Sequence, residues 1–146
     1  MVPFPPRPLT AAQRATLISN ALEARNGSYS PYSKFRVGAC LLAEDGSYVS
    51  GANVESASYG GTICAERTAI VKGVSEGKRK YVGLAVTRCA PFASGAFARW
   101  FLTSSGAASP SDLVTAITPC GICRQVLREF CPLDMPILLV PASYAE

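Results

Sequence analysis

Two short segments decide how this sequence is interpreted: Cys-Ala-Glu-Arg-Thr-Ala at residues 64–69 and Pro-Cys-Gly-Ile-Cys-Arg-Gln at residues 119–125. Together they supply three cysteines and one carboxylate, in a chain of 146 residues that contains no histidine. A single C-x-x-C pair is weak evidence of a site, whereas a third cysteine beside an acid on a second segment is specific. The pattern therefore predicts one site assembled from distant parts of the chain.

The number and spacing of the three cysteines suit Zn²⁺. Cys64, Cys120 and Cys123 can hold the ion and leave its fourth tetrahedral position open to water, as in catalytic rather than structural zinc sites. Glu66 lies two residues from a ligand, close enough to handle the protons of that water without binding the metal. The other cysteines lack ligand spacing and are expected to be small buried apolar residues: Cys40, Cys89 and Cys131.

The hydrophobic pattern predicts a single α/β domain with elements in the order α-β-β-α-β-α-β. The expected helices cover residues 11–24 and 64–76, and a third begins at Cys120; the expected strands cover residues 35–42, 47–54, 81–87 and 137–140. Thr10 and Gln13 indicate a capping box before the first helix, and Glu-Asp-Gly at residues 44–46 indicates a hairpin turn. Because each cysteine segment opens a helix, its thiols meet the positive end of a helix dipole, which favours thiolate.

Composition limits the partners and the compartment. Hydrophobic residues make up 49% of the chain and charged residues 16%, which favours apolar surface buried between subunits. The net charge is +4, but the only basic run, residues 78–80, fits a solvated helix exit better than a nucleic-acid patch. Residues 1–8 contain four prolines, and no apolar stretch fits a signal peptide or a membrane span. We expect a cytoplasmic protein with a disordered tail at residues 1–9 and one domain at residues 10–146.

Both cysteine segments resemble those of the cytidine deaminase family almost letter for letter. The same holds for Ser-Pro-Tyr-Ser-Lys-Phe-Arg-Val-Gly-Ala at residues 30–39 and Gly-Ala-Asn-Val-Glu at residues 51–55. The resemblance implies the cytidine deaminase fold, with α-β-α layers and a mixed sheet flanked by helices, and a Zn²⁺ cofactor. It also implies hydrolytic deamination of cytidine and deoxycytidine to uridine and deoxyuridine, with release of ammonia, in pyrimidine salvage.

Residues around the metal receive roles from the same resemblance. It implies that Glu66 is the catalytic proton carrier, that Arg67 hydrogen-bonds the metal thiolates, and that Gln125 supports the site from outside the ligand set. A homotetramer is implied as well, with a homodimer as the alternative.

A second constellation suits a nucleoside substrate. Asn53 and Glu55 are two residues apart at the end of an expected strand, so their side chains point to the same side. An amide beside a carboxylate suits the two-way hydrogen bonding of a sugar hydroxyl. The resemblance implies that these two residues hold the ribose, that Phe35 lines the base pocket and that Ala65 also binds substrate. It further implies that Tyr59 contributes to a neighbouring subunit's pocket.

Two departures from the family pattern stand out. Residues 90–118 form an insert where the family has a short connection, and the insert contains Phe92, Phe97, Trp100 and Phe101. The chain ends at Glu146, without the usual C-terminal strand and the aromatic lid that closes a neighbour's pocket. We expect part of the insert to pack against a neighbouring subunit and help to close the pocket; a flexible outer insertion is the alternative.

Other functions remain open at this point. The nearest alternative is deamination of another aminopyrimidine nucleoside, of the blasticidin type. A different class is a non-enzymatic zinc-stabilised domain, whose fourth ligand could only be Cys131, the one nearby spare thiol. Editing of single-stranded nucleic acid is less favoured, because Arg99 and Trp100 are nearly all that the chain offers for a basic, stacking groove.

Overall fold

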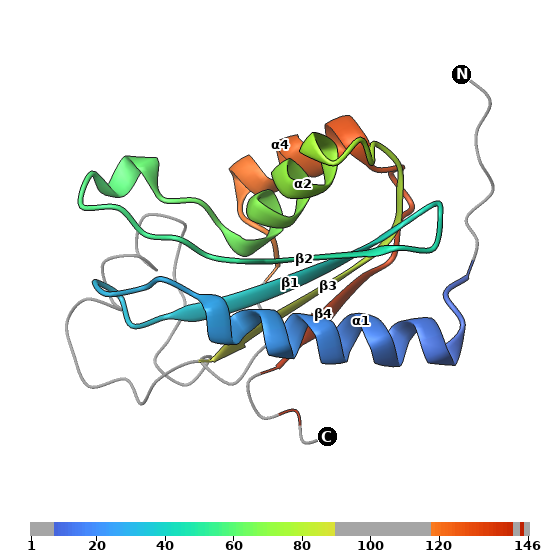
Figure 1. Ribbon diagram of the computed structural model, residues 1–146, viewed down its shortest axis with the longest axis horizontal. Helices are drawn as coiled ribbons and strands as arrows, with labels where there is room; N and C mark the ends of the chain where they lie inside the picture. Colours follow the sequence, from blue (N-terminus) through green and yellow to red (C-terminus); the bar gives the residue numbers. More distant parts are fainter. Residues whose placement is uncertain (1–7, 90–117, 142–143, 145–146) are drawn as a thin grey trace.

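The computed structural model describes residues 8–89, 118–141 and 144, which form three layers (Figure 1). Helix α1 covers one face of a sheet, and helices α2 and α4 cover the other. The elements are α1 (Ala11–Ala24), η1 (Arg25–Gly27), β1 (Arg36–Ala43), β2 (Tyr48–Ala52), η2 (Tyr59–Gly61), α2 (Ala65–Ser75), β3 (Tyr81–Cys89), α4 (Gly121–Phe130) and β4 (Ile137–Val140). Every predicted helix and strand is present, in the predicted order.

The sheet has the strand order β2-β1-β3-β4 and is mixed, as predicted. β1 pairs antiparallel with both β2 and β3, whereas β3 and β4 are parallel. Two neighbouring parallel strands need a crossover connection, and α4 lies on that connection. The crossover places α4 beside α2 on one face of the sheet, so the two cysteine segments belong to the same layer.

Several boundaries differ from the sequence prediction by one or two residues, and two of them lie near the candidate site. β2 ends at Ala52 rather than at residue 54, because Val54 pairs with Tyr29 and Ile63 outside the sheet. α2 begins at Ala65, and Cys64 is its N-cap in an extended conformation. The capping box is confirmed: Thr10 Oγ1 accepts from the N–H of Gln13, whose side chain accepts from the N–H of Thr10.

Each face of the sheet buries its own apolar cluster. The larger cluster lies under α2 and α4 and includes Leu41, Val49, Ile70, Leu84 and Leu127. The smaller cluster lies under α1 and includes Leu9, Leu17, Ala21, Cys40, Leu42 and Ala85. The alternation of strand side chains between the two faces produces this division, so both faces are dry and the functional groups must lie at an edge or at helix ends.

Leu9 corrects one boundary of the sequence prediction. The disordered tail was expected to include residue 9, but the Leu9 side chain is only 7% exposed and packs in the α1 cluster, where it excludes water from apolar neighbours. The ordered chain therefore begins before the α1 capping box. Residues 1–7 of the predicted tail lie outside the described residues.

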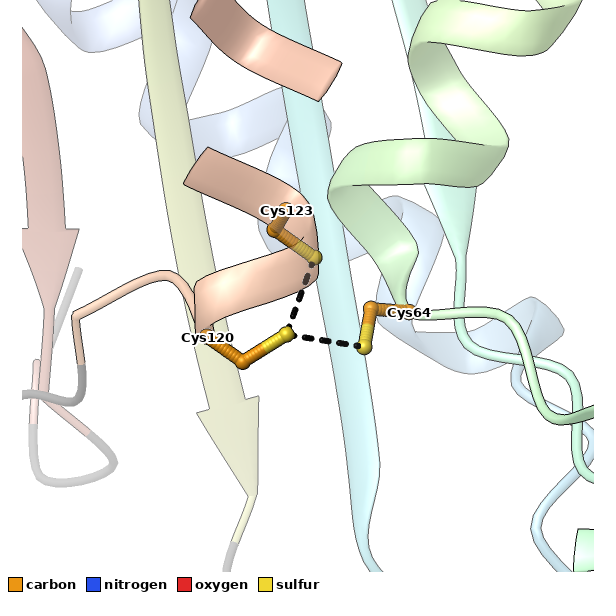
Figure 2. Close-up of side chains that lie close together, drawn as sticks. All are labelled: Cys64, Cys120 and Cys123. Carbon is orange, nitrogen blue, oxygen red and sulfur yellow. Dashed lines mark hydrogen bonds between the residues drawn. The ribbon is translucent and has the colours of Figure 1, made fainter. Parts of the chain in front are cut away.

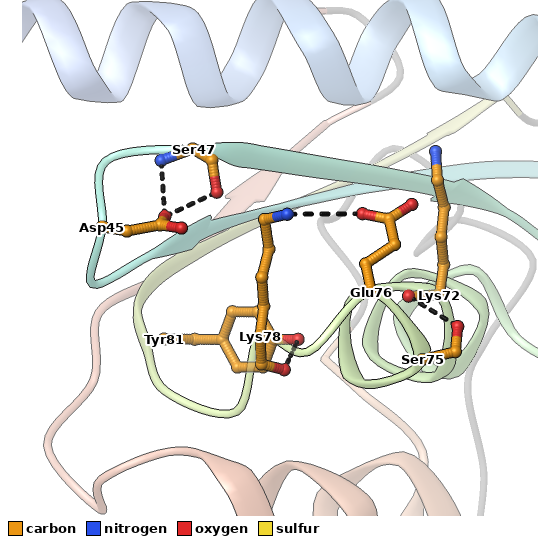
Figure 3. A network of polar contacts seen from close by, with 7 residues as sticks. All are labelled: Asp45, Ser47, Lys72, Ser75, Glu76, Lys78 and Tyr81. Atoms are coloured by element: carbon orange, nitrogen blue, oxygen red, sulfur yellow. Dashed lines mark hydrogen bonds and ion pairs between the residues drawn. The ribbon is translucent and has the colours of Figure 1, made fainter.

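Polar contacts stabilise the β1–β2 turn and the C-terminal end of α2, both of which lie away from the cysteines (Figure 3). In the β1–β2 turn, Asp45 Oδ1 accepts from the N–H of Ser47 at 2.9 Å and from its hydroxyl at 2.6 Å. After α2, the Tyr81 hydroxyl donates to the Lys78 carbonyl at 2.9 Å, and Lys78 Nζ lies 3.5 Å from Glu76 Oε2.

Within residues 8–89 and 118–141, every helix is too short or too polar to cross a membrane.

Gly51 sets how closely α2 approaches the sheet. A Cβ built at this position of β2 would lie 2.4 Å from the Ala69 nitrogen and 2.9 Å from the Ala65 oxygen, which are backbone atoms of α2. Real side chains do not tolerate such distances, so the helix backbone rests directly on the strand because residue 51 has no side chain. This contact determines where the start of α2, and therefore Cys64, lies.

We expect Gly51→Ala to destabilise the fold by about 1–3 kcal/mol, because the added methyl must push α2 away from β2. Chemical denaturation followed by circular dichroism measures the change. Gly27→Ala is the matched control, since a Cβ there has no atom within 4 Å. Equal stability of the two variants would show that α2 does not depend on this contact.

Candidate metal centre and active site

Three thiols from two helix starts meet at one point above the sheet (Figure 2). Cys64 is the N-cap of α2, Cys120 is the N-cap of α4, and Cys123 lies in the first turn of α4. The Cys64 and Cys120 sulfurs are 3.9 Å apart, and the Cys120 and Cys123 sulfurs are 3.5 Å apart. All three sulfurs lie within 4.8 Å of one another. The structure thus assembles the predicted cluster.

The cluster fits a zinc ion. Tetrahedral zinc with Zn–S bonds of about 2.3 Å holds its sulfurs about 3.8 Å apart, close to the two shorter spacings here. Three sulfur donors are also the soft ligand set that zinc accepts. Within the part of the chain that the structure describes, these three cysteines are the only such metal-ligating group. Three protein ligands leave one tetrahedral position open.

Cys131 does not close the cluster, which removes the basis of the structural-zinc alternative. It caps the far end of α4, eight residues beyond Cys123, or about 12 Å along a helix. Its side chain packs in the core under α2 and α4, and this burial raises the pKa of the thiol to about 12. Cys131 is therefore an inert apolar residue, as the sequence predicted.

The surroundings distribute charge unevenly over the thiols. A hydrogen bond from Cys123 and the nearby Arg67 guanidinium lower the pKa of Cys64 to about 5. The pKa of Cys123 is raised, because its thiol donates to Cys64 and is buried. Arg67 Nη2 lies 3.8 Å from the Cys64 sulfur and donates to the Thr62 carbonyl at 2.8 Å. The Thr62 carbonyl therefore orients the guanidinium toward the cluster.

Glu66 is a buried carboxyl in the first turn of α2, two residues after Cys64. It is 5% exposed, and burial raises the pKa of its carboxyl, with a further contribution from the Cys64 thiolate. A carboxyl in this environment exchanges a proton more readily near neutral pH than an exposed one does. The site therefore places a buried carboxyl with a raised pKa next to three thiols that could hold a metal ion.

Asn53 holds the start of β1 with its side-chain amide. Its Nδ2 donates to the Phe35 carbonyl at 2.8 Å, and its Oδ1 accepts from the Val37 N–H at 2.8 Å. The Ser28 hydroxyl donates to the same oxygen at 2.6 Å. The Asn53 side chain is buried. Its amide links the backbone of Phe35 to the segment that precedes α2.

Glu55 is buried under the loop before β1. Its Oε2 accepts from the backbone N–H groups of Tyr32 at 3.0 Å and Ser33 at 3.1 Å, and its Oε1 accepts from the Ser33 hydroxyl. The Tyr59 hydroxyl lies 3.5 Å from Oε1. Burial raises the pKa of Tyr59, and the Glu55 charge raises it further. Asn53 and Glu55 therefore share one polar network, and both are buried while Val54 between them is exposed.

Two predicted site residues are placed differently. Ala65 is 0% exposed, because it packs in the core against β2, and its substrate contact stays a prediction. Gln125 is exposed, and two residues along a helix correspond to a rotation of about 200°, so it lies on the opposite side of α4 from buried Cys123. The structure brings Arg67 to the cluster, and the supporting role of Gln125 stays a prediction. The predicted insert aromatics at residues 92–101 lie outside the described residues.

Two contributors were not assigned roles from the sequence. The Thr62 carbonyl is a backbone group, and the sequence gives no signal for it. The Ser33 hydroxyl accepts from the N–H of Phe35 at 3.0 Å, which is a serine turn. The serine two residues before Phe35, following a proline, was the available signal for that turn.

Comparisons with known proteins agree with this site. Residues 11–139 match the family described as "Cytidine and deoxycytidylate deaminase zinc-binding region". A cytidine deaminase from Halalkalibacterium halodurans is 44% identical over 86% of this chain and 78% of its own length. One from Sporosarcina psychrophila is 42% identical over 84% and 74%. The crystal structure of a cytidine deaminase from Burkholderia pseudomallei matches with a TM-score of 0.62 and 35% identity, covering 84% of this chain and 77% of that one.

The fold and the site define a zinc-dependent α/β hydrolase with a three-cysteine centre. The chain belongs to the cytidine and deoxycytidylate deaminase zinc-binding family. The family resemblance, the fold class and the zinc cofactor expected from the sequence are confirmed.

We expect about one zinc ion per wild-type chain and loss of that zinc in Cys120→Ala/Cys123→Ala, because the double variant retains a single sulfur of the cluster. Elemental analysis of the purified proteins gives the stoichiometry. Cys131→Ser is the control and should retain full zinc. Zinc retained by the double variant would place the metal elsewhere.

Proposed function

We propose that this protein hydrolyses the exocyclic C4–N bond of cytidine and deoxycytidine, giving uridine or deoxyuridine and ammonia, in pyrimidine salvage. One observation carries the proposal: a buried carboxyl, Glu66, stands beside a three-thiol cluster whose fourth position no described residue fills. The curated relatives at 42–44% identity are named cytidine deaminases, which supports this substrate.

Zinc held by Cys64, Cys120 and Cys123 would supply the polarisation that makes a water nucleophilic at neutral pH. Glu66 does the proton work. It takes a proton from the attacking water and delivers it to ring nitrogen N3 as the water oxygen bonds to C4. It then takes the remaining proton from the new C4 hydroxyl and gives it to the amine, which leaves as ammonia as the C4–N bond breaks and the C4–O bond becomes a carbonyl. The raised pKa of Glu66 suits both directions of transfer, because a group that titrates closer to the working pH gives and takes a proton readily.

Arg67 compensates for the charge of the thiolates. Three thiolates around a divalent ion carry a formal net charge of −1, which opposes the acidification of water. The guanidinium, 3.8 Å from the Cys64 sulfur, and the N-termini of α2 and α4 withdraw part of that charge. These contacts keep the centre acidic enough for its reaction.

Phe35, Asn53 and Glu55 would bind the nucleoside. Phe35 lies at the start of β1, next to the amide of Asn53 that holds its carbonyl. Glu55 keeps a carboxylate oxygen, Oε1, beside the Tyr59 hydroxyl, where a sugar hydroxyl could join the network. An apolar ring for the base beside polar groups for the sugar matches the two halves of a nucleoside.

We propose a cytoplasmic location for this protein. The described cysteines are free thiols, and a centre built on thiolates needs a compartment that keeps them reduced. The substrate proposed here also belongs to intracellular nucleoside metabolism.

We further propose that the protein is a homotetramer. Large apolar side chains are exposed on and just after the helices of the α2–α4 layer: Val71 by 62%, Ile122 by 61% and Leu133 by 79%. A second subunit that covers them would remove this area from water.

The sharpest test of the activity is Glu66→Gln. We expect this variant to keep its zinc and its fold and to lose about 10²–10⁴-fold in turnover, because the amide fills the same space without carrying a proton. The fall in ultraviolet absorbance of cytidine measures turnover. Glu76→Gln, an exposed position near the other end of α2, is the control with wild-type turnover. Near-normal turnover in Glu66→Gln would assign the proton transfer to another group.

The oligomeric state is tested separately. We expect sedimentation equilibrium to give a mass near four times the 15.4 kDa chain, and Val71→Glu to reduce it, because a charge cannot be buried unpaired in an apolar interface. A monomer mass for the wild-type protein would contradict the tetramer without bearing on the chemistry.

A further inference from the structure

The loop at residues 29–35 is attached to the Asn53–Glu55 segment along its whole length. Backbone hydrogen bonds join the Tyr29 N–H to the Asn53 carbonyl at 3.0 Å and the Glu55 N–H to the Tyr29 carbonyl at 2.8 Å. The Glu55 carboxylate then accepts from the N–H groups of Tyr32 and Ser33. The loop therefore follows the position of Glu55.

Ser33 occupies a special place in this network because its hydroxyl joins Glu55 to Phe35 and also lies next to the Tyr59 hydroxyl. It donates to Glu55 Oε1 and accepts from the N–H of Phe35 at 3.0 Å. A serine hydroxyl has a single proton to donate, so it is committed to Glu55 while its lone pair holds Phe35. One oxygen atom thus connects the proposed sugar-binding carboxylate to the proposed base-binding residue.

The backbone of Phe35 is held from both sides. Its N–H is bound by Ser33, and its carbonyl accepts from Asn53 Nδ2 at 2.8 Å. Lys34, between Ser33 and Phe35, has a φ of 57°, in the left-handed region that a side chain rarely adopts. Its N–H bonds to the Ser30 carbonyl at 3.0 Å. A strained residue persists only where its surroundings hold it, so Ser33 and Asn53 together fix the backbone of Phe35, from which its ring extends.

We propose that Ser33 is a positioning residue that couples Glu55 to Phe35, so that sugar and base recognition depend on one hydroxyl. This inference rests on the proposed function, because it assigns Phe35 and Glu55 to the nucleoside. Without the Ser33 hydroxyl, the Phe35 N–H loses its hydrogen bond to Ser33. Glu55 Oε1 loses its Ser33 donor and keeps the longer contact with Tyr59. Ser33 affects the binding of the nucleoside rather than the chemical step, because its hydroxyl contacts Glu55 and Phe35 and neither the cysteines nor Glu66.

The test is a double-mutant cycle on cytidine kinetics with Ser33→Ala, Glu55→Gln and both together. We expect Ser33→Ala to raise KM about three- to tenfold, the size of one lost hydrogen bond, with kcat within about twofold of wild type and zinc content unchanged. In the Glu55→Gln background the same change should raise KM by a clearly smaller factor, because the partner through which Ser33 acts is already altered. Ser33→Thr, which keeps a hydroxyl, should restore most of the KM.

Ser75→Ala is the matched control, since Ser75 is an exposed serine whose hydroxyl donates to the Lys72 carbonyl at 2.8 Å on α2. Thermal unfolding of each variant verifies the fold. An unchanged KM in Ser33→Ala, an equal KM increase in both backgrounds, or a loss confined to kcat would each overturn the coupling. Absence of cytidine turnover in the wild-type protein would instead overturn the proposed function, so the two failures are distinguishable.

Discussion

The packing of α2 and α4 on the same face of the sheet is the constraint on which the candidate site depends. Cys64 and Cys120 are far apart in sequence, and their sulfurs lie 3.9 Å apart only because α2 and α4 cover the same face of the sheet. The parallel pair β3–β4 requires a crossover, and the crossover carries α4 to that face. Gly51 lets α2 rest on β2 backbone to backbone, which sets the height of its first turn. Sheet topology and one missing side chain therefore determine the geometry of the metal ligands.

Burial at the same helix starts gives the site its chemistry. The helix N-termini and Arg67 stabilise negative charge on sulfur, whereas the core behind α2 withdraws water from Glu66 and raises its pKa. The pKa of Cys64 is lowered and that of Glu66, two residues later, is raised, because Cys64 faces the cluster and Glu66 lies against the protein interior. A sulfur ligand that stays ionised beside a carboxyl that protonates readily is a useful pair for hydrolysis. The fold produces both properties from one helix turn.

The proposed substrate-binding residues make a different kind of interaction. Asn53 and Glu55 follow the end of β2 and use nearly all of their hydrogen-bonding capacity to hold the loop before β1. Buried amides and carboxylates need such partners, since an unpaired one is costly. Asn53 and Glu55, which the sequence suggests as substrate-binding residues, therefore also hold the loop before β1 in place. The two roles are compatible, because positioning the loop is what positions Phe35.

Much of this could be predicted from the sequence, since local rules govern it. The periodicity of apolar residues located each helix and strand, and Thr10 with Gln13 marked the start of α1. The proposed metal ligands and Glu66 were predicted from residue type and spacing in two motifs, and the structure brings the three cysteines together. Family resemblance extended this to Arg67, which the structure places at Cys64.

The sequence by itself determined the elements, the ligand set and the class of chemistry, because these depend on residue type and on neighbours a few positions away. Only the tertiary structure decided that Leu9 belongs to the core and that α2 and α4, with their cysteines, lie side by side. The same holds for the contacts of Ser33. Each of these depends on which side chains distant segments bring into contact, and contact across space is set by packing rather than by spacing along the chain.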